Sequence, residues 1–230
     1  MIPWLKPTDP PEAFPPVTRA LEDPDGLLCA GGDLRPARIL AAYRRGIFPW
    51  YAAGQPILWW SPDPRMVLIP DELRVSRSLR KSLRNRGYRV TFDAAFGEVV
   101  SQCADSGVRA FEGTWISPEM HAAYVELHRL GHAHSVEVWL GERLVGGLYG
   151  LELGRVFFGE SMFSAETDAS KVALFHQVAA VRDRGVELID CQVASNHLFS
   201  LGARLMPRAE FVARLERAMP RRSTPDRTAR

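Results

Sequence analysis

Cysteine is scarce in this chain of 230 residues, and its three thiols, Cys29, Cys103 and Cys191, form no C-x-x-C pair. An odd, unpaired set is typical of reduced thiols rather than of a disulfide framework or a zinc knuckle. Residues 1–7 contain two prolines and no apolar h-region, so the sequence predicts no secretory signal. The strongly apolar runs are strand-like, such as residues 136–140, far below the roughly 20 residues that a bilayer demands. We therefore expect a cytoplasmic protein with no membrane span and no structural metal.

Phosphate-binding loops are also missing. The sequence contains neither G-x-x-x-x-G-K-[ST] nor a G-x-G-x-x-G between a strand and a helix. Without those loops, neither a nucleoside triphosphate nor a dinucleotide has its usual backbone cradle. We expect no cofactor and no activation of a substrate by ATP.

Charge is nearly balanced overall but unevenly distributed, with 29 Lys and Arg against 27 Asp and Glu. Residues 74–89 hold seven basic side chains and no acidic one, and residues 207–230 hold seven arginines against three acids. The rest of the chain is therefore acidic. Such segregation predicts that one surface meets a polyanion and another meets a cationic group.

The texture of the sequence changes near residue 65. Residues 1–65 are dense in proline and glycine, which block long helices and central strands, so we expect a small, loop-rich N-terminal lobe with one helix at 36–45. Residues 66–219 alternate between strand and helix patterns and predict an α+β domain with a mostly antiparallel, mixed sheet. Residues 220–230 form a basic tail.

The expected order of elements is similar to that of an N-acetyltransferase-like fold. Strand patterns lie at 66–69, 88–92, 134–140, 143–151, 155–160 and 186–192, and helix patterns at 76–85, 94–104, 117–130, 168–184 and 209–219. That fold binds coenzyme A through a glycine-rich loop before its central helix, but residues 161–168 contain no glycine. A coenzyme A-dependent N-acetyltransferase stays open as an alternative.

The most specific signals are phrases of several residues. They are residues 31–34 (GGDL), 42–50 (AYRRGIFPW), 59–65 (WWSPDPR), 114–116 (TWI), 158–164 (FGESMFS), 169–171 (ASK), 188–192 (LIDCQ) and 200–203 (SLGA). In this order, from about residue 4 to residue 205, the chain resembles the leucyl/phenylalanyl-tRNA-protein transferases of bacteria. The resemblance implies transfer of Leu or Phe from Leu-tRNA or Phe-tRNA to proteins that begin with Arg or Lys, which marks them for degradation by the N-end rule.

This chemistry agrees with the missing phosphate loops. An aminoacyl ester is already activated, so forming a peptide bond from it needs no ATP. The enzyme has to position two substrates and manage one proton, because an α-amine with a pKa near ~8 is mostly protonated at neutral pH. Some polar side chain must therefore favour the free amine.

Asp190 and Gln192 lie two residues apart on a predicted strand, so alternation places them on one face, about 6.6 Å apart. We assign Gln192 to accepting a hydrogen bond from the amine, with Asp190 polarising that contact. The family resemblance implies similar roles for these two residues. The alternative is that both satisfy backbone groups at a strand end. On the same strand, alternation should point Cys191 away from Asp190 and Gln192, as a buried, inert thiol. Glu160 ends the neighbouring strand and is expected to pair with the acceptor's cation, the alternative being a salt bridge to Lys171.

An apolar pocket for the Leu or Phe side chain is implied by the resemblance at Leu148, Phe157, Met162, Leu174 and Ile189, although all five could be ordinary core. The same resemblance implies further substrate contacts at Trp59, Trp115, Tyr124 and Asn196. Among Trp50, Trp59, Trp60 and Trp115, we expect one or two to stack on the terminal adenine of the tRNA. Asn196 could instead cap the turn that follows it.

One basic segment has the spacing of an amphipathic helix. Arg77, Arg80, Lys81 and Arg84 fall at i, i+3, i+4 and i+7, which places them on one face, while Val75, Leu79 and Leu83 form the other. The basic face suits the phosphates of a tRNA acceptor stem, and a merely solvated face is the alternative. A non-catalytic RNA-binding protein would explain this helix, but not the polar cluster of Glu160, Asp190 and Gln192.

Overall fold

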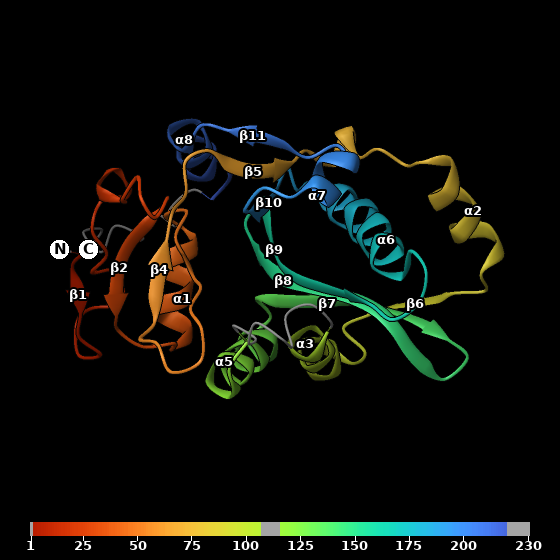
Figure 1. Ribbon diagram of the computed structural model, residues 1–230, viewed down its shortest axis with the longest axis horizontal. Helices are drawn as coiled ribbons and strands as arrows, with labels where there is room; N and C mark the ends of the chain where they lie inside the picture. The colour runs from red at the N-terminus through yellow and green to blue at the C-terminus, as the bar shows by residue number, and fades with distance from the viewer. Residues whose placement is uncertain (1, 107–115, 220–230) are drawn as a thin grey trace, which may run out of the picture.

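The computed structural model describes residues 2–106 and 116–219, and within them it has two β-sheets (Figure 1). The first is small and belongs to the N-terminal part of the chain. Its strand order is β1 (Trp4–Leu5), β2 (Leu27–Gly31), β4 (Leu58–Trp60) and β3 (Phe48–Pro49). The helix α1 (Pro36–Tyr43) and the 3-10 turn η1 (Val17–Arg19) complete this lobe.

The lobe is therefore more regular than the sequence predicted. We expected loops around one helix, but four strands of two to five residues pair there. The prolines do not prevent these strands: Pro49 itself lies in β3, where it pairs with Trp59 of β4. Strands this short show too few alternating positions for a period of two to be detected in the sequence.

The second sheet has seven strands and forms the larger part of the protein. Their order is β11 (Arg204–Met206), β5 (Arg65–Leu68), β10 (Leu188–Gln192), β9 (Val156–Ser164), β8 (Arg143–Leu153), β7 (Ala133–Leu140) and β6 (Arg89–Phe92). All neighbours are antiparallel except β9 and β10, which run parallel. This confirms the predicted α+β class and the mostly antiparallel, mixed sheet.

Helices cover both faces of this sheet. The helix α6 (Ala169–Asp183) packs on one face, and α3 (Phe96–Asp105) and α5 (Pro118–Arg129) pack on the other (Figure 1). The start of α5 follows directly from the sequence: Ser117 caps it by accepting a hydrogen bond from the backbone N–H of Met120, and Pro118 occupies the first turn. The remaining elements are η2 (Pro70–Glu72), α2 (Arg77–Asn85), α7 (Asn196–Ser200) and α8 (Arg208–Ala218).

The parallel pair at the centre of the large sheet separates after a short contact. The strands β9 and β10 pair only through residues 156–158 and 188–190. Just beyond that point, each strand has one residue more than its antiparallel neighbour: Glu160 is the extra residue of β9 against β8, and Cys191 is that of β10 against β5. Such β-bulges bend a strand and re-aim its side chains. The parallel pair therefore splays beyond residues 158 and 190.

One core joins the lobe to the larger part of the molecule. Buried residues of α1, such as Ile39 and Tyr43, belong to the same apolar cluster as Phe158 of β9 and Phe211 of α8. The chain passes from the small sheet to the large one between Trp60 and Arg65, and we propose a domain boundary there. Among the residues described, no helix is long and apolar enough to span a membrane.

Candidate active site

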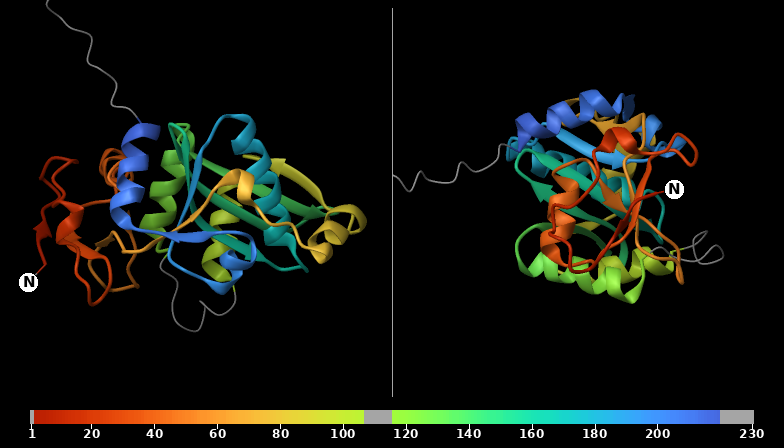
Figure 2. Two further views of the ribbon diagram at one scale, coloured as in Figure 1. Left: turned by 90° about the horizontal axis from the view of Figure 1, so that it is seen from above. Right: turned by 90° about the vertical axis from the view of Figure 1, so that its left-hand side faces the viewer.

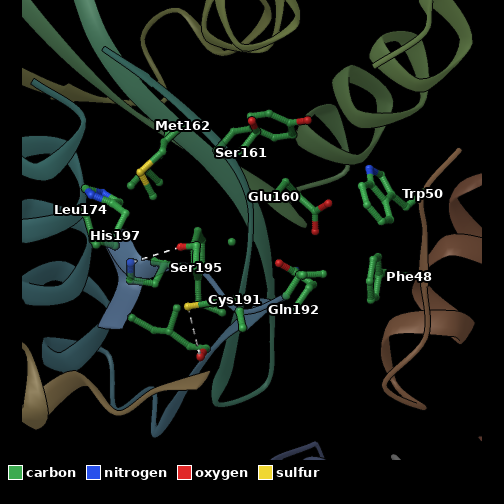
Figure 3. A pocket seen from close by; sticks show the side chains of 18 of the residues that line it. Phe48, Trp50, Glu160, Ser161, Met162, Leu174, Cys191, Gln192, Ser195 and His197 are labelled. Atoms are coloured by element: carbon green, nitrogen blue, oxygen red, sulfur yellow. Dashed lines mark hydrogen bonds between the residues drawn. The ribbon is translucent and has the colours of Figure 1, made fainter. Parts of the chain in front are cut away.

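A pocket of about 470 Å³ opens where β9 and β10 separate (Figure 3). Its walls come from β8, β9, α6, β10 and the segment that leads into α7, and residues 48–50 of the lobe close it from the opposite side. Figure 3 shows two different ends. Glu160 and Gln192 face Phe48 and Trp50 at one end, which we call the polar end, and Met162 and Leu174 lie at the other, the apolar end.

The apolar end contains every residue that the sequence assigned to it. Leu148 of β8, Phe157 and Met162 of β9, Leu174 of α6 and Ile189 of β10 all line the pocket. Met162 is half-buried, whereas the other four are buried. All five thus contribute to the pocket wall, in addition to packing in the core.

At the polar end, the carboxyl group of Glu160 is held by two tyrosines. The hydroxyl of Tyr43 donates to Oε1 of Glu160 at 2.7 Å, and the hydroxyl of Tyr124 donates to Oε2 at 2.7 Å. Burial raises the pKa of Glu160 to about 7, although the two phenols and Arg65 act in the opposite direction. The alternative partner, Lys171, pairs with Asp168 at 2.9 Å, so a salt bridge between Lys171 and Glu160 is wrong.

Asp190 is not in the pocket. Its carboxylate is buried on the other side of β10, where it accepts hydrogen bonds from Nε and Nη2 of Arg65 at 2.8 and 2.7 Å. The guanidinium group of Arg65 lies 4.7 Å from the ring centre of Phe48 and 4.8 Å from that of Phe211. Oδ1 of Asp190 also accepts the backbone N–H of Gln192 at 3.0 Å. This matches the alternative in which Asp190 satisfies a backbone group at a strand end.

Gln192 does reach the pocket, but by a different route from the one predicted. The bulge at Cys191 and the left-handed backbone of Gln192, with φ of 57°, break the alternation of β10. As a result Cys191 and Gln192 both line the pocket while Asp190 does not, so the predicted shared face of Asp190 and Gln192 is wrong. The expectation that Cys191 points away from the site is wrong for the same reason. Burial raises the pKa of the Cys191 thiol, which keeps it protonated at neutral pH.

The side-chain amide of Gln192 has unused hydrogen-bonding capacity. The residue is only 8% exposed, and its Nε2 has no hydrogen-bond partner among the described residues. A buried amide nitrogen without a partner costs stability, so such groups usually serve a ligand or a water molecule. In Figure 3 the side chain extends toward Glu160 and Phe48.

The tryptophans occupy different places from those predicted. Trp59 is fully buried in the lobe, where its Nε1 donates to the carbonyl of Gly31 at 2.9 Å, so its predicted contact with substrate is wrong. Trp50 lines the pocket and is 44% exposed, which leaves a ring face free for stacking. Trp60 donates to the carbonyl of Trp50 at 2.6 Å. Trp115 lies outside the described residues.

Two other residues that were predicted to contact substrate do not line the pocket. Tyr124 is fully buried behind Glu160 and does not line the pocket. Asn196 is exposed at the start of α7 and does not line it either, whereas Ser195, His197 and Leu198 do. The capping role that we considered for Asn196 belongs to Ser195, whose hydroxyl accepts the backbone N–H of Leu198.

The site residues that the sequence analysis missed include Tyr43, Phe48 and Arg65, which build its polar end. All three lie inside phrases that carry the family resemblance, residues 42–50 and 59–65. Those phrases indicated importance but no role. The partners of Tyr43 and Arg65, at Glu160 and Asp190, are 117 and 125 residues away in sequence.

The basic helix has the predicted form. Ser76 caps α2 by accepting the backbone N–H of Leu79, and Leu79 is buried. The four cations of the predicted face are exposed, and none has an ion-pair partner among the described residues: Arg77, Arg80, Lys81 and Arg84. Figures 1 and 2 place α2 and the N-terminal lobe at opposite ends of the molecule, with α6 beside α2.

The fold and the pocket together define an α+β protein whose substrate-sized pocket lies where the one parallel strand pair of its mixed sheet separates. Within residues 2–106 and 116–219, no group of three or more His, Cys, Asp or Glu side chains could hold a metal ion. Residues 67–216 match the model of the leucyl/phenylalanyl-tRNA protein transferase family, and residues 32–63 match the N-terminal domain of the same family. The chain belongs to this family, and it is an aminoacyltransferase that uses aminoacyl-tRNA and protein as substrates.

Individual relatives support this membership over nearly the whole chain. A leucyl/phenylalanyl-tRNA–protein transferase of Aromatoleum aromaticum is 62% identical over 215 residues, which is 94% of this chain and 89% of that protein. One of Stutzerimonas stutzeri is 59% identical over 227 residues, 98% of this chain and 99% of that protein. Among solved structures, the match to FemX covers 74% of this chain and 66% of the FemX chain, with 12% identity and a TM-score of 0.48.

Proposed function

We propose that this enzyme transfers Leu or Phe from Leu-tRNA or Phe-tRNA to the α-amino group of proteins that begin with Arg or Lys. The product carries an N-end rule degradation signal, and the reaction takes place in the cytoplasm. One observation supports the proposal above all others. A single pocket combines an apolar end with a polar end that contains a carboxyl group and an unpartnered amide.

The donor side chain is proposed to occupy the apolar end. Leu and Phe share a Cβ without branches, and Met162 suits a site that accepts both, because a thioether side chain adapts to different shapes. The exposed ring of Trp50 is the stacking surface that we propose for the terminal adenine of the tRNA. The phosphates of the acceptor stem would then contact the cations of α2.

The acceptor is proposed to bind at the polar end. Oε1 of Gln192 accepts a hydrogen bond from the incoming amine, and Glu160 pairs with the cationic side chain of the first residue. Asp190 is a positioning residue in this account, because it holds the backbone N–H of Gln192 and is itself held by Arg65. Placing the amine against the ester carbonyl is the kind of orientation effect that supplies about 7–11 kcal/mol of barrier reduction.

A direct transfer assay tests the proposal. The full-length protein is mixed with Leu-tRNA and with two peptides that differ only in a first residue of Arg or Ala, and the products are analysed by mass spectrometry. We expect one added leucine on the Arg peptide and little on the Ala peptide. Equal addition to both peptides would remove Glu160 as the group that selects the acceptor, and addition to neither would contradict the transfer itself.

A further inference from the structure

Three oxygen pairs around Glu160 form a closed ring. Its carboxyl oxygens lie 2.7 Å from the hydroxyls of Tyr43 and Tyr124, and these two hydroxyls lie 2.8 Å from each other. All three separations are ordinary lengths for O–H···O hydrogen bonds. Each such bond needs one proton between its two oxygens.

Counting protons decides the charge of the ring. Two neutral phenols supply two protons, and an ionised carboxylate supplies none. With Glu160 ionised, one of the three close contacts would bring two oxygens together without a proton between them. With Glu160 protonated, three protons serve three contacts: Glu160 donates to one phenol, that phenol to the other, and the second phenol back to the carboxyl group.

We propose that Glu160 keeps a proton while the site is empty, that Tyr43 and Tyr124 are positioning residues that hold its carboxyl group, and that binding of the acceptor's cationic side chain expels this proton. The proposal rests on the proposed function, in which Glu160 meets that side chain. The step is balanced: the O–H bond of the Glu160 carboxyl group breaks, its electron pair stays on the carboxylate that pairs with the cation, and the proton leaves to the solvent. No oxidant or further reactant is needed.

The surroundings of the ring are consistent with this step. Burial raises the pKa of Glu160, as does the negative charge of Asp190 on β10, while Arg65 on β5 lowers it. The ring of Tyr149 on β8 lies 5.4 Å from that of Tyr124, and Cys191 and His197 line the same pocket. A cation within about 4–6 Å of a carboxyl group lowers its pKa by 1–3 units, which is enough to ionise Glu160 at neutral pH when the acceptor arrives.

The two phenols also connect the ring to separate parts of the fold. Tyr43 ends α1 of the lobe and Tyr124 lies on α5, and both are fully buried. Replacing either by Phe removes one hydrogen bond that lowers the pKa of Glu160 and breaks the ring, with little change of volume. The phenols therefore influence catalysis through Glu160 rather than by touching the substrate.

Calorimetry of the full-length enzyme measures the expelled proton. Titrating a peptide that begins with Arg, in two buffers of different ionisation enthalpy, gives the number of protons released on binding. The matched control is the same peptide with a first residue of citrulline, which keeps the α-ammonium group but loses the side-chain charge. We expect the Arg peptide to release about one proton more than the citrulline peptide at pH 6, and this difference to approach zero above pH 8 and in Glu160→Gln.

Two further measurements do not depend on binding heats. Infrared difference spectra at pH 6 should show a protonated carboxyl band that disappears when the Arg peptide is added and that is absent from Glu160→Gln. In transfer assays, kcat/KM for the Arg peptide should fall about tenfold for each pH unit below the midpoint, and Tyr43→Phe and Tyr124→Phe should move that midpoint upward.

The outcomes separate this proposal from the proposed function. If the wild-type enzyme adds leucine to the Arg peptide but releases no extra proton and shows no carboxyl band, the ring holds only two protons and the proposal is wrong. If both tyrosine variants lose activity without a shift of the midpoint, the phenols serve packing alone. Failure of the wild-type enzyme to transfer leucine would contradict the proposed function instead.

Discussion

The two ends of the pocket differ in how the backbone builds them. The apolar end uses regular positions: strand residues of β8, β9 and β10 and one helical residue of α6. The polar end uses irregular ones, because Glu160 and Cys191 are the extra residues of two bulges and Gln192 has a positive φ. All five apolar residues named from the sequence line the pocket, whereas the polar ones are not arranged as predicted. Regular backbone keeps side chains where the sequence pattern places them, and bulges do not.

The largest effect is expected at Asp190, which supports the polar end without lining the pocket. Asp190→Ala should leave the buried guanidinium of Arg65 without a carboxylate, with only the carbonyl of Gly46 among the described residues to accept from it, and lower the free energy of unfolding by about 3–5 kcal/mol. Urea titration followed by circular dichroism measures this loss.

Two comparisons make the Asp190 result interpretable. Glu126→Ala, which removes an exposed partner of Arg129, should leave the unfolding free energy near that of the wild type. Replacing both Arg65 and Asp190 by Met and Leu should recover much of the stability, because no buried charge is then left alone. A stable Asp190→Ala would mean that the buried pair is not what holds the polar end.

At Gln192 we expect the opposite result: a substitution should reduce activity and leave stability almost unchanged. Gln192→Ala removes an amide whose Nε2 has no partner in the described structure, so we expect little change in unfolding but a loss of transfer by tenfold or more. Gln177→Ala is the matched control: it also has a buried, unpartnered Nε2, but it lies outside the pocket and should keep activity. Wild-type transfer rates in a folded Gln192→Ala would remove the residue from the mechanism.

The basic helix should act on affinity and leave both ends of the pocket unaffected. If all four cations neutralise phosphates, log K for tRNA should fall with log salt at a slope of roughly −3 to −4. Arg80→Glu with Arg84→Glu should weaken every tRNA by roughly tenfold and reduce that slope by about 1.5, with the choice of Leu or Phe preserved. Filter binding at several salt concentrations measures both quantities.

A control for the helix comes from other exposed arginines. Reversing Arg129 and Arg155, which lie on α5 and next to β9, changes the net charge equally but should leave the salt slope in place. An unchanged slope in the α2 variant would show that α2 is only a solvated face, and would direct attention to the C-terminal arginines.

The apolar end should yield the smallest effect, a change of preference rather than of rate. Met162→Ala enlarges the donor end and should shift the product ratio several-fold toward Phe when Leu-tRNA and Phe-tRNA compete. Phe163→Leu should keep the wild-type ratio. Phe163 is the next residue along β9, but it packs in the core that joins the lobe to the larger part of the molecule, whereas Met162 packs against the core on the other side of the sheet. Mass spectrometry of the mixed products gives the ratio directly, and an unchanged ratio in Met162→Ala would separate Met162 from donor selection.

These residues also show what could be predicted from the sequence. Six strands of the large sheet, the longer helices and the cap of α5 followed from periodicity and end signals, most clearly where an element has eight or more residues. The short elements β11 and α7 were missed. The lobe strands were missed too, since they are too short. The family phrases contain Glu160 and Gln192, and both line the pocket.

Long-range pairs were beyond the reach of the sequence. Nothing in a pattern of neighbours indicates that Arg65 pairs with Asp190 or that Tyr43 donates to Glu160. The first contact depends on the pairing of β5 with β10, and the second on how α1 packs against β9. The sequence does not reveal a bulge either, because the same residues of β10 could form a regular strand. The geometry of the polar end therefore required the structure.

The position of Arg65 has a consequence for how the enzyme matures during synthesis. Its guanidinium group is enclosed by Phe48 from the first quarter of the chain, Asp190 from the last quarter, and Phe211 from α8. A nascent chain that has emerged only through β9 already contains Glu160 and both tyrosines, yet it holds Arg65 without its carboxylate. Since domains fold as the chain emerges, the polar end can be assembled only near the completion of translation. An incomplete chain on the ribosome thus lacks the support of its acceptor site.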